Sequence, residues 1–521
     1  MRFREIVLTP AEAFDEHALS TVLFQKTGLS PDDFFIVPRK RSVDARGKKV
    51  VVRMRVEVVP RREGQPEIQY NKPDKQVSQA QSVIIVGSGP AGLFAALRLI
   101  EEGFKPIVLE RGSSVQLRRR DLAAINKYHI VNPESNYCFG EGGAGTYSDG
   151  KLYTRSTKRG DVHRILQILV AHGARRDILF DAHPHIGTNK LPKLVESLRQ
   201  TILDCGGEIY FNTRVVELLI RSNAVDGVLT QNKDKINARA VILATGHSAR
   251  DVFEMLHQHH VALQCKPFAL GVRVEHPQQL IDEIQYHCTG PRNHWLPASS
   301  YSLVHQSGVK EKRGVFSFCM CPGGFIVPSA TSPGEVVVNG MSPSRRDSRF
   351  ANSGIVVSVS ESDFAIFASS GPLAGVRFQA DIEQRACAAA GGTQTAPALR
   401  LTDFLHNRLS ASLPESSYQP GLAVADFYSF LPPFIIKSLQ EGFKAFGKKM
   451  RGYITEEAVV VGVESRTSSP VRIPRNPTTL QHPQIKGLFP CGEGAGYAGG
   501  IVSAAMDGER CAGAAAKYLS S

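Results

Sequence analysis

The sequence has no long apolar run. Although 42% of its 521 residues are hydrophobic, no stretch reaches the 18 or more apolar residues that span a bilayer, and the first residues hold no apolar segment of signal-peptide length. The nine cysteines are scattered and odd in number, which argues against a disulfide framework and for a reducing compartment. We therefore expect a cytoplasmic protein of two or three domains that makes no membrane contact.

Acidic residues are outnumbered by basic ones, and the formal net charge is +13 at pH 7. Such a charge attracts anions, including cofactors, phosphorylated substrates and nucleic acid. No RNA-binding signature of the RNP1 or KH type is present, so a solvated basic surface is the favoured explanation. Basic residues alternate with valines over residues 37–56, which predicts a half-buried strand with a basic outer face.

The pattern of strands, helices and turns predicts an α/β protein. Residues 1–80 form a small α+β domain with a polar linker at its end, and residues 81–265 form the first part of a Rossmann-like dinucleotide-binding domain. Residues 266–455 are less regular and predict an inserted substrate or lid domain. Residues 456–521 again read as strand, glycine turn and helix, so they are expected to return to the dinucleotide-binding domain.

The segment "VIIVGSGPAGLFAALRLIEEGFKPIVLE" carries the dinucleotide fingerprint. Gly87 permits a tight turn, Gly89 lets the backbone approach a pyrophosphate, and Gly92 lets the following helix pack closely on the sheet. The helix N-terminus supplies N–H donors and partial positive charge to the phosphates. Glu110 ends the next strand, where its carboxylate can accept the ribose hydroxyls and would repel the 2′-phosphate of NADP.

A second glycine cluster lies about 400 residues later, in "GLFPCGEGAGYAGGIVSAAMDG". It resembles the second signature of FAD sites, in which an acid holds the ribitol and a helix N-terminus points at the flavin ring. Glu493 stands where aspartate is usual, and Gly499 and Gly500 precede the helix. "VILATG" resembles a third motif of such flavoproteins, so we expect both glycine clusters to hold one FAD. The expected cofactor-binding residues are Gly87, Ser88, Gly89, Pro90, Ala91, Gly92, Glu110, Arg111, Gly112, Gly145, Ser148, Lys151, Val215, Thr245, Gly246, Gly492, Glu493, Gly499, Gly500 and Ile501.

Nearly the whole chain resembles the bacterial FAD-dependent oxidoreductases that are usually labelled only as uncharacterised FAD-dependent dehydrogenases. The resemblance rests on "RSVDARGKK", "GGAGTYSDGKLYTR", "HPHIGTNKL", "SFCMCPGG", "NGMSPSRRDSRFANSGIVV" and "ESRTSSPVRIPR". These proteins are distant relatives of the fumarate-reductase-type and glutathione-reductase-type flavoproteins. The resemblance implies FAD and redox chemistry, and it fixes no substrate. We expect the FAD to be bound non-covalently, although the sequence leaves covalent attachment open.

Three segments offer candidate catalytic side chains. The glycine-rich stretch 139–155 is expected to line the flavin, with Lys151 near the ring stabilising its anionic reduced form, or else to be a structural loop. Cys319 and Cys321 share one face of a strand and could be a redox pair, a metal half-site or small buried hydrophobes, the last being favoured. Arg466 and Ser468 could bind an anionic group beside the flavin or only tie two domains together. No complete metal site is expected.

We therefore expect an FAD-dependent oxidoreductase that acts on a small anionic molecule. Only one dinucleotide fold is visible, so NAD(P)H would bind transiently over the flavin if it is the electron donor. The alternatives are a flavoprotein that modifies RNA and a flavin-loaded redox sensor or assembly factor. In the last case the N-terminal domain would bind a protein partner.

Overall fold

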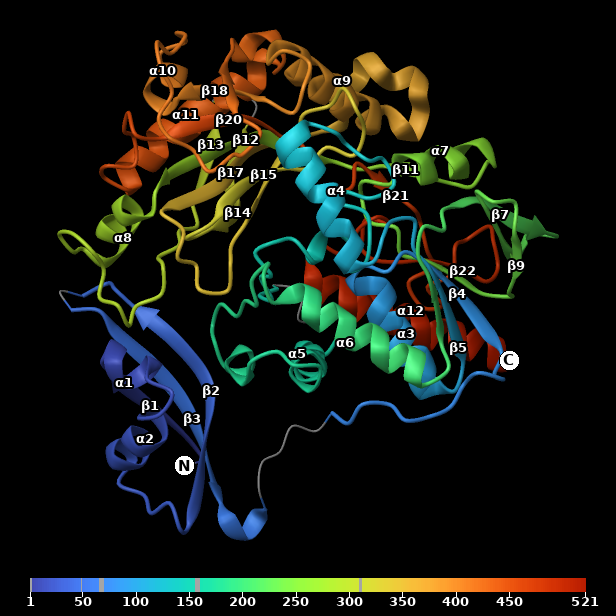
Figure 1. The fold of residues 1–521 in the computed structure, drawn as a ribbon, viewed down its shortest axis with the longest axis horizontal. Coiled ribbons are helices and arrows are strands. Elements are labelled where there is room, and N and C mark those ends of the chain that lie inside the picture. The colour runs from blue at the N-terminus through green and yellow to red at the C-terminus, as the bar shows by residue number, and fades with distance from the viewer. Residues whose placement is uncertain (1, 48, 65–69, 155–159, 309–311) are drawn as a thin grey trace.

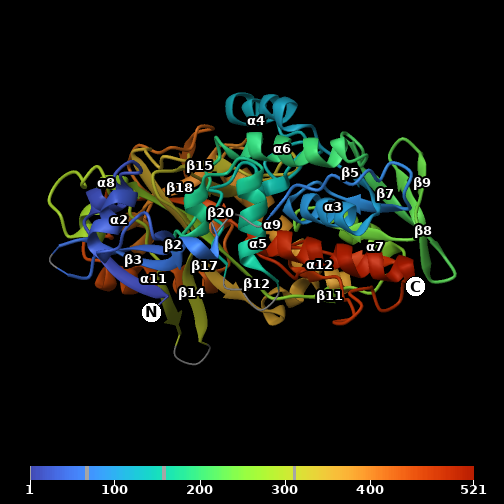
Figure 2. The ribbon, with the colours of Figure 1, turned by 90° about the horizontal axis from the view of Figure 1, so that it is seen from below.

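The computed structural model describes residues 2–47, 49–64, 70–154, 160–308 and 312–521, and residues 65–69 of the expected linker lie outside them (Figure 1). Three units are visible. A small N-terminal unit lies at one end of the molecule, and two larger units each surround a β-sheet (Figure 2). Among the described residues, no helix is both long and apolar enough to cross a membrane.

The first large unit contains a five-stranded parallel sheet in the order β22-β10-β4-β5-β6. Its strands are β4 (Ser82–Val86), β5 (Lys105–Leu109), β6 (Glu208–Tyr210), β10 (Val241–Leu243) and β22 (Leu488–Pro490). Alternate residues of β4 face opposite cores. Val83 and Ile85 pack with one hydrophobic cluster and Ile84 and Val86 with another, as a parallel sheet covered on both faces requires.

Helices cover one face of this sheet, and a β-meander with one helix covers the other. The helical face is formed by α3 (Pro90–Glu102), α5 (Val162–Ala171), α6 (Leu191–Asp204) and α12 (Ile501–Ser520). The opposite face carries β7 (Val215–Arg221), β8 (Ala224–Thr230), β9 (Lys235–Asn237) and α7 (Arg250–Gln258). The C-terminal helix α12 packs against α3, and an added Cβ at Gly508 would lie 2.1 Å from the Ala91 carbonyl oxygen. The chain therefore returns to its first α/β unit at its end.

The second large unit contains a seven-stranded mixed sheet in the order β13-β14-β17-β12-β20-β18-β19. Its strands are β12 (Phe268–Pro277), β13 (Val304–Ser307), β14 (Arg313–Cys321), β17 (Phe350–Val359), β18 (Ala396–Arg400), β19 (Leu422–Val424) and β20 (Val459–Glu464). The accompanying helices are α8 (Gln278–Tyr286), α9 (Ala374–Ala389), α10 (Leu401–Leu405) and α11 (Pro433–Lys449). A short hairpin, β15 (Phe325–Pro328) with β16 (Val338–Met341), lies beside the sheet.

The N-terminal unit is a three-stranded antiparallel sheet with two helices on one side. It consists of β1 (Phe3–Leu8), α1 (Pro10–Phe14), α2 (Leu19–Thr27), β2 (Phe34–Asp44) and β3 (Val51–Pro60). Arg41 joins it to the first large unit. Its backbone N–H donates to the Phe180 carbonyl at 2.7 Å, and its guanidinium pairs with Asp181 at 2.7 Å.

The α/β class, the Rossmann-like unit and the additional domains agree with the expectation from sequence. One boundary differs. Residues 456–521 were assigned to the dinucleotide-binding unit, but β20 hydrogen-bonds with β12 and β18 in the seven-stranded sheet. The six residues of β20 are all buried, and a buried apolar run does not reveal which of two sheets it joins.

Candidate functional site

A cavity of about 390 Å³ lies between the two large sheets. One wall comes from the carboxyl ends of β4 and β10, at Val86 and Ala244, which is where open α/β sheets bind ligands. The facing wall includes Phe318 and Cys319 of β14. The expected cofactor-binding residues that line the cavity are Gly87, Gly89, Pro90, Ala91, Glu110, Arg111, Gly145, Ser148, Lys151, Val215, Thr245, Gly246, Glu493, Gly499, Gly500 and Ile501. The other four, Ser88, Gly92, Gly112 and Gly492, are not among the lining residues.

The glycines of the first cluster have different neighbours. Gly87 has φ +102°, and a Cβ there would lie 2.6 Å from the Ala244 carbonyl oxygen. A Cβ at Gly92 would lie only 1.9 Å from the Gly87 carbonyl oxygen, so glycine is required for α3 to approach the turn. At Gly89, the residue before α3, the nearest atom is the Gly143 Cα at 4.0 Å. Gly89 thus opens onto the cavity, while Gly87 and Gly92 serve the fold.

Glu110 is buried and joins three loops at the cavity wall. Its carboxylate accepts hydrogen bonds from the Ser88 backbone N–H at 2.9 Å, the Ser88 hydroxyl at 2.8 Å, the Gly112 N–H at 2.9 Å and the Gly140 N–H at 3.0 Å. These four bonds use about all the lone pairs of a carboxylate. Glu110 therefore organises the loops in addition to facing the cavity, and its expected contact with ribose hydroxyls stays a prediction.

The glycine-rich loop expected at residues 139–155, described to residue 154, lies over both helix starts. A Cβ at Gly143 would lie 3.2 Å from the Gly89 Cα, and one at Gly145 would lie 3.2 Å from Pro90 and 3.3 Å from Ile501. The loop is thus placed between the N-termini of α3 and α12.

A buried arginine that the sequence analysis did not single out holds this loop. Arg118, on α4 (Val115–Tyr128), is fully buried and donates to the carbonyls of Asn136, Tyr137, Glu141 and Gly143 at 2.8–2.9 Å. It stands among three consecutive arginines, and only the helical spacing of the buried residues of α4, Val115, Arg118, Leu122 and Ile125, distinguishes it. That spacing was the available signal.

The second glycine cluster also opens onto the cavity. An added Cβ at Gly499 or Gly500 would meet no protein atom within 4 Å, and Gly500, the residue before α12, has φ +138°. Glu493 lines the cavity, and burial raises the pKa of its carboxyl to about 7. The two glycine clusters therefore line one cavity, as the sequence indicated.

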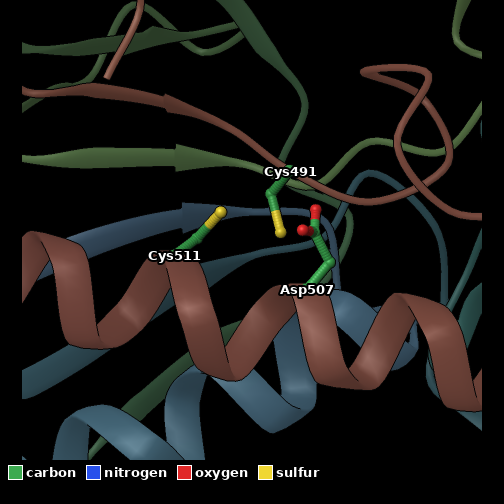
Figure 3. A group of neighbouring side chains, drawn as sticks. All are labelled: Cys491, Asp507 and Cys511. Atoms are coloured by element: carbon green, nitrogen blue, oxygen red, sulfur yellow. The ribbon is translucent and has the colours of Figure 1, made fainter. Parts of the chain in front are cut away.

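Three buried side chains lie behind the second glycine cluster and hold it in place. Cys491 follows β22, and Asp507 and Cys511 project toward it from α12 (Figure 3). Their donor atoms lie within 4.8 Å of one another, close enough to hold a metal ion. However, Arg475 donates to both carboxylate oxygens of Asp507, at 2.9 and 2.6 Å, and to the Cys511 sulfur at 3.3 Å. The guanidinium thus supplies the positive charge that a metal ion would bring.

Asp507 also reaches the glycine cluster itself. It accepts a hydrogen bond from the Gly492 N–H at 2.8 Å, which ties the start of the cluster to α12. Gly492 therefore supports the cavity wall from behind.

Lys151 and two thiols meet on the wall formed by β14. The Lys151 Nζ donates to the Met320 carbonyl and lies 3.8 Å from the Cys319 sulfur and 3.9 Å from the Cys321 sulfur. Its side chain is 36% exposed and lines the cavity. Burial alone would lower the pKa of Lys151, but its neighbours Cys319, Cys321 and Asp149 raise it. The ammonium charge therefore lies against the thiols, and its expected role at the flavin ring stays a prediction.

Asp149 completes this group from the other side of Lys151. It lies 3.7 Å from the Lys151 Nζ and accepts a hydrogen bond from Arg346 at 2.7 Å. Burial would raise the pKa of Asp149, yet Lys151 and Arg346 lower it to about 2, so it is a carboxylate. Its buried Oδ1 has no partner in the described part of the chain, and the residue lines the cavity.

Arg466 and Ser468 differ from each other in position. Arg466 lines the cavity, but it donates to both oxygens of Glu383, at 3.1 and 2.9 Å, to Glu335 at 2.9 Å and to Thr331 at 2.6 Å. Because an arginine has five N–H donors, little remains for a substrate. This geometry favours the alternative in which Arg466 ties elements together. Ser468 lines a second cavity rather than this one.

Comparison with known proteins identifies the cofactor class. Residues 82–120 match an FAD binding domain, residues 183–299 match FAD dependent oxidoreductase, and residues 267–467 match FAD-dependent protein, C-terminal domain-like. An uncharacterized protein of Clostridium beijerinckii is 40% identical over 520 residues, covering 96% of this chain and 95% of that protein. The chain belongs to the FAD-dependent oxidoreductases. The resemblance stated from the sequence is thereby confirmed.

Other similarities to this oxidoreductase are more distant. Thiamine thiazole synthase of Aeropyrum pernix is 27% identical over 182 residues, which cover 32% of this chain and 55% of the synthase. A solved structure of a flavocytochrome c3 fumarate reductase in its open conformation is 14% identical in sequence. The match covers 86% of this chain and 79% of the reductase chain, with a TM-score of 0.36. Residues 1–59 match a domain of unknown function.

The residues of the cavity fit FAD. The backbone faces open space at Gly89 on one side of the cavity and at Gly499 and Gly500 on the other. Because these glycines have no side chains, there is room for a ligand. Two helices, α3 and α12, begin at this cavity, and helix N-termini favour anionic and hydrogen-bond-accepting groups. We therefore propose that this cavity holds the flavin, and we call it the flavin cavity.

Proposed function

We propose that this FAD-dependent oxidoreductase acts on a small anionic molecule that binds in a second cavity beside the flavin cavity. The observation that carries the proposal is a shared wall, since Phe318 and Thr467 line both cavities. A molecule in the second cavity would therefore lie against two residues that also line the flavin cavity.

The second cavity has a lining suited to an anion. Lys312 and Arg313 contribute positive charge, and the hydroxyl-bearing residues are Ser358, Ser360, Ser362, Thr467 and Ser468. Arg313 is held by Asp363 at 2.6 and 2.7 Å, so Lys312 is the better candidate for direct contact. Cations and hydroxyls together recognise carboxylate or phosphate oxygens. In this proposal Ser468 would contact the substrate in the second cavity, rather than beside the flavin as expected from the sequence.

FAD, when bound, supplies the two-electron chemistry. The chain's own residues would position it. Backbone N–H groups at the starts of α3 and α12 would bind its polar groups, with Glu493 facing the same cavity. Lys151 and Cys319 would lie on the wall that faces the substrate side.

The test is a titration of the FAD-loaded enzyme with small carboxylates, phosphates and sulfonates, followed by the flavin absorption spectrum. We expect at least one class to perturb the spectrum, and Lys312→Gln to weaken that binding about tenfold or more. Lys437→Gln is the control, because Lys437 is exposed on α11 and lines neither cavity. Equal binding by both variants, or no perturbation by any anion, would contradict the proposal. Anaerobic mixing with NADH and NADPH tests them as electron donors.

The N-terminal sheet gives no specific support to RNA modification. Several of its basic residues are paired with acids, including Arg39 with Glu57 at 2.5 Å and Arg53 with Asp44 at 2.8 Å. Arg41 is buried against Asp181. We therefore propose no second function.

A further inference from the structure

Cys319 and Cys321 are brought together by an irregularity in β14. The pairing register between β14 and β17 shifts between Phe318 and Cys321, and Cys319 has φ +45°, which is uncommon for a residue other than glycine. In a regular strand, residues two apart are separated by roughly 7 Å. A bulge re-aims side chains and is common beside active sites. Here the Cys321 thiol donates to the Cys319 carbonyl at 3.2 Å, and both sulfurs lie within 4 Å of the Lys151 Nζ.

Two positive groups lie beside the pair, and each is also paired with a carboxylate: Lys151 with Asp149 at 3.7 Å, and Arg273 with Glu464 at 2.8 Å. Lys151 lies within 4 Å of both sulfurs, and Arg273 donates to the Cys319 carbonyl at 3.4 and 3.3 Å. Two fixed positive groups disfavour a bound metal ion, and they favour a thiolate. Its neighbours Cys321, Lys151 and Arg273 lower the pKa of Cys319 well below its usual value, whereas Cys319 and burial raise the pKa of Cys321.

The two thiols also differ in access. Cys319 lines the flavin cavity, whereas Cys321 is fully buried behind it. This is the arrangement of an attacking sulfur and a resolving sulfur, because the half-buried Cys319 can be reached from the flavin cavity and the buried Cys321 can reach only its neighbour.

We propose that Cys319 and Cys321 form a redox-active dithiol that exchanges an electron pair with the flavin, so that the small anionic substrate is a disulfide or the corresponding thiol. The inference rests on the proposed function. Cys319 lines the flavin cavity and not the second one, so a substrate disulfide would have to extend past the shared wall at Phe318; Cys319 would then attack it, releasing one thiol and forming a mixed disulfide. Cys321 would then displace the second thiol and form the Cys319–Cys321 disulfide. Two electrons and two protons from the reduced flavin would restore both thiols.

The first arm of the test counts electrons. FAD-loaded enzyme is oxidised with diamide, freed of reagent and titrated anaerobically with dithionite. We expect four electrons per FAD, two for the flavin and two for the disulfide. Cys319→Ser and Cys321→Ser should each take up two. Cys288→Ser, a thiol outside both cavities, should still take up four.

The second arm does not depend on the flavin. After diamide treatment, the FAD-free protein is denatured in an alkylating reagent and digested, and the peptide containing both cysteines is weighed. We expect it unalkylated and two hydrogens lighter than the reduced peptide. Lys151→Met should slow alkylation of Cys319 in the folded protein about tenfold or more at pH 7. An uptake of two electrons by the wild type, with both cysteines alkylated after diamide, would overturn the proposal.

The two hypotheses can be separated. Protein that binds no FAD would contradict the proposed function, while the peptide masses would still decide whether the dithiol forms a disulfide. Protein that binds FAD and an anion but forms no disulfide would leave the proposed function standing and overturn only this inference.

Discussion

The two glycine clusters look alike in sequence, and each contains glycines of two kinds. In both clusters some glycines are required because the chain's own backbone lies too close for a side chain. An added Cβ at Gly92 would lie 1.9 Å from the Gly87 carbonyl oxygen, and one at Gly494 would lie 2.4 Å from the Gly246 carbonyl oxygen. Others face open space, with no protein atom closer than 4.0 Å at Gly89 and none within 4 Å at Gly499. The first kind builds the fold and the second leaves room for the ligand.

This difference makes the cofactor assignment testable by substitution. A methyl group at a fold glycine should damage the protein with or without FAD. The same methyl group at a ligand glycine should leave the FAD-free protein intact and affect only binding.

The largest effect is expected for Gly92→Ala. The new methyl group would overlap the Gly87 carbonyl oxygen, and relieving the overlap would move α3 away from β4. We expect a loss of stability of about 3 kcal/mol or more, the upper end for overpacking. Soluble yield and the midpoint of thermal unfolding measure it. Gly513→Ala in α12 is the control, because its Cβ meets no atom within 4 Å and alanine favours helix. A Gly92→Ala protein with the wild-type midpoint would show that the turn can relax.

The next effect is expected for Gly89→Ala. Because its Cβ would be 4.0 Å from the nearest atom, the midpoint of the FAD-free protein should change by no more than about 2 °C. The dissociation constant for FAD should rise about 100-fold, since the methyl group stands where the pyrophosphate approaches the helix start, and this corresponds to about 3 kcal/mol. Fluorescence titration with FAD measures it. Unchanged affinity would place the pyrophosphate elsewhere.

The dinucleotide fingerprint could be predicted from sequence because its cause is local. The positive φ of the turn at Gly87 and the approach of α3 to that turn at Gly92 depend on residues within one strand, turn and helix. Lys151 and Cys319 were likewise singled out as candidates. Their proximity was not, because it depends on a bulge in β14 and on contact between segments 168 residues apart.

The second cavity could not be predicted for the same reason. Ser468 was chosen for its neighbourhood of arginines and hydroxyls, and Arg466 for its charge. Only the tertiary structure shows that Glu383 and Glu335 satisfy Arg466, while Ser468 faces another space beside Lys312. Partner choice among buried charges is set by packing between distant segments, which local patterns do not encode.

A smaller loss of FAD affinity, about tenfold or 1.4 kcal/mol, is expected for Gly499→Ala. This position tests the second cluster more cleanly than Gly500, because φ at Gly500 is +138° and any side chain there strains the backbone. Gly513→Ala, on the same helix but away from the cavity, should bind FAD like the wild type. Full affinity in Gly499→Ala would mean that the two clusters do not share one ligand.

The smallest effect concerns Glu493 and depends on pH. Burial raises the pKa of its carboxyl from 4.5 to about 7, so the neutral form is favoured in the folded state. The neutral carboxyl therefore makes its full contribution to the free energy of unfolding below about pH 4.5, and this contribution is lost as the pH rises through 7. The full shift corresponds to about 3 kcal/mol, and because the side chain is partly open to the cavity, solvent screening reduces it to about 1–2 kcal/mol.

Glu493→Gln cannot ionise, so its unfolding midpoint should exceed that of the wild type by roughly 1–3 °C at pH 8 and by less at pH 5. The comparison uses FAD-free protein, because bound ligand also stabilises, and Glu457→Gln, at an exposed position, serves as the control. An equal difference at both pH values would mean that Glu493 does not titrate in this range, and that the flavin cavity holds it as a carboxylate like Asp149.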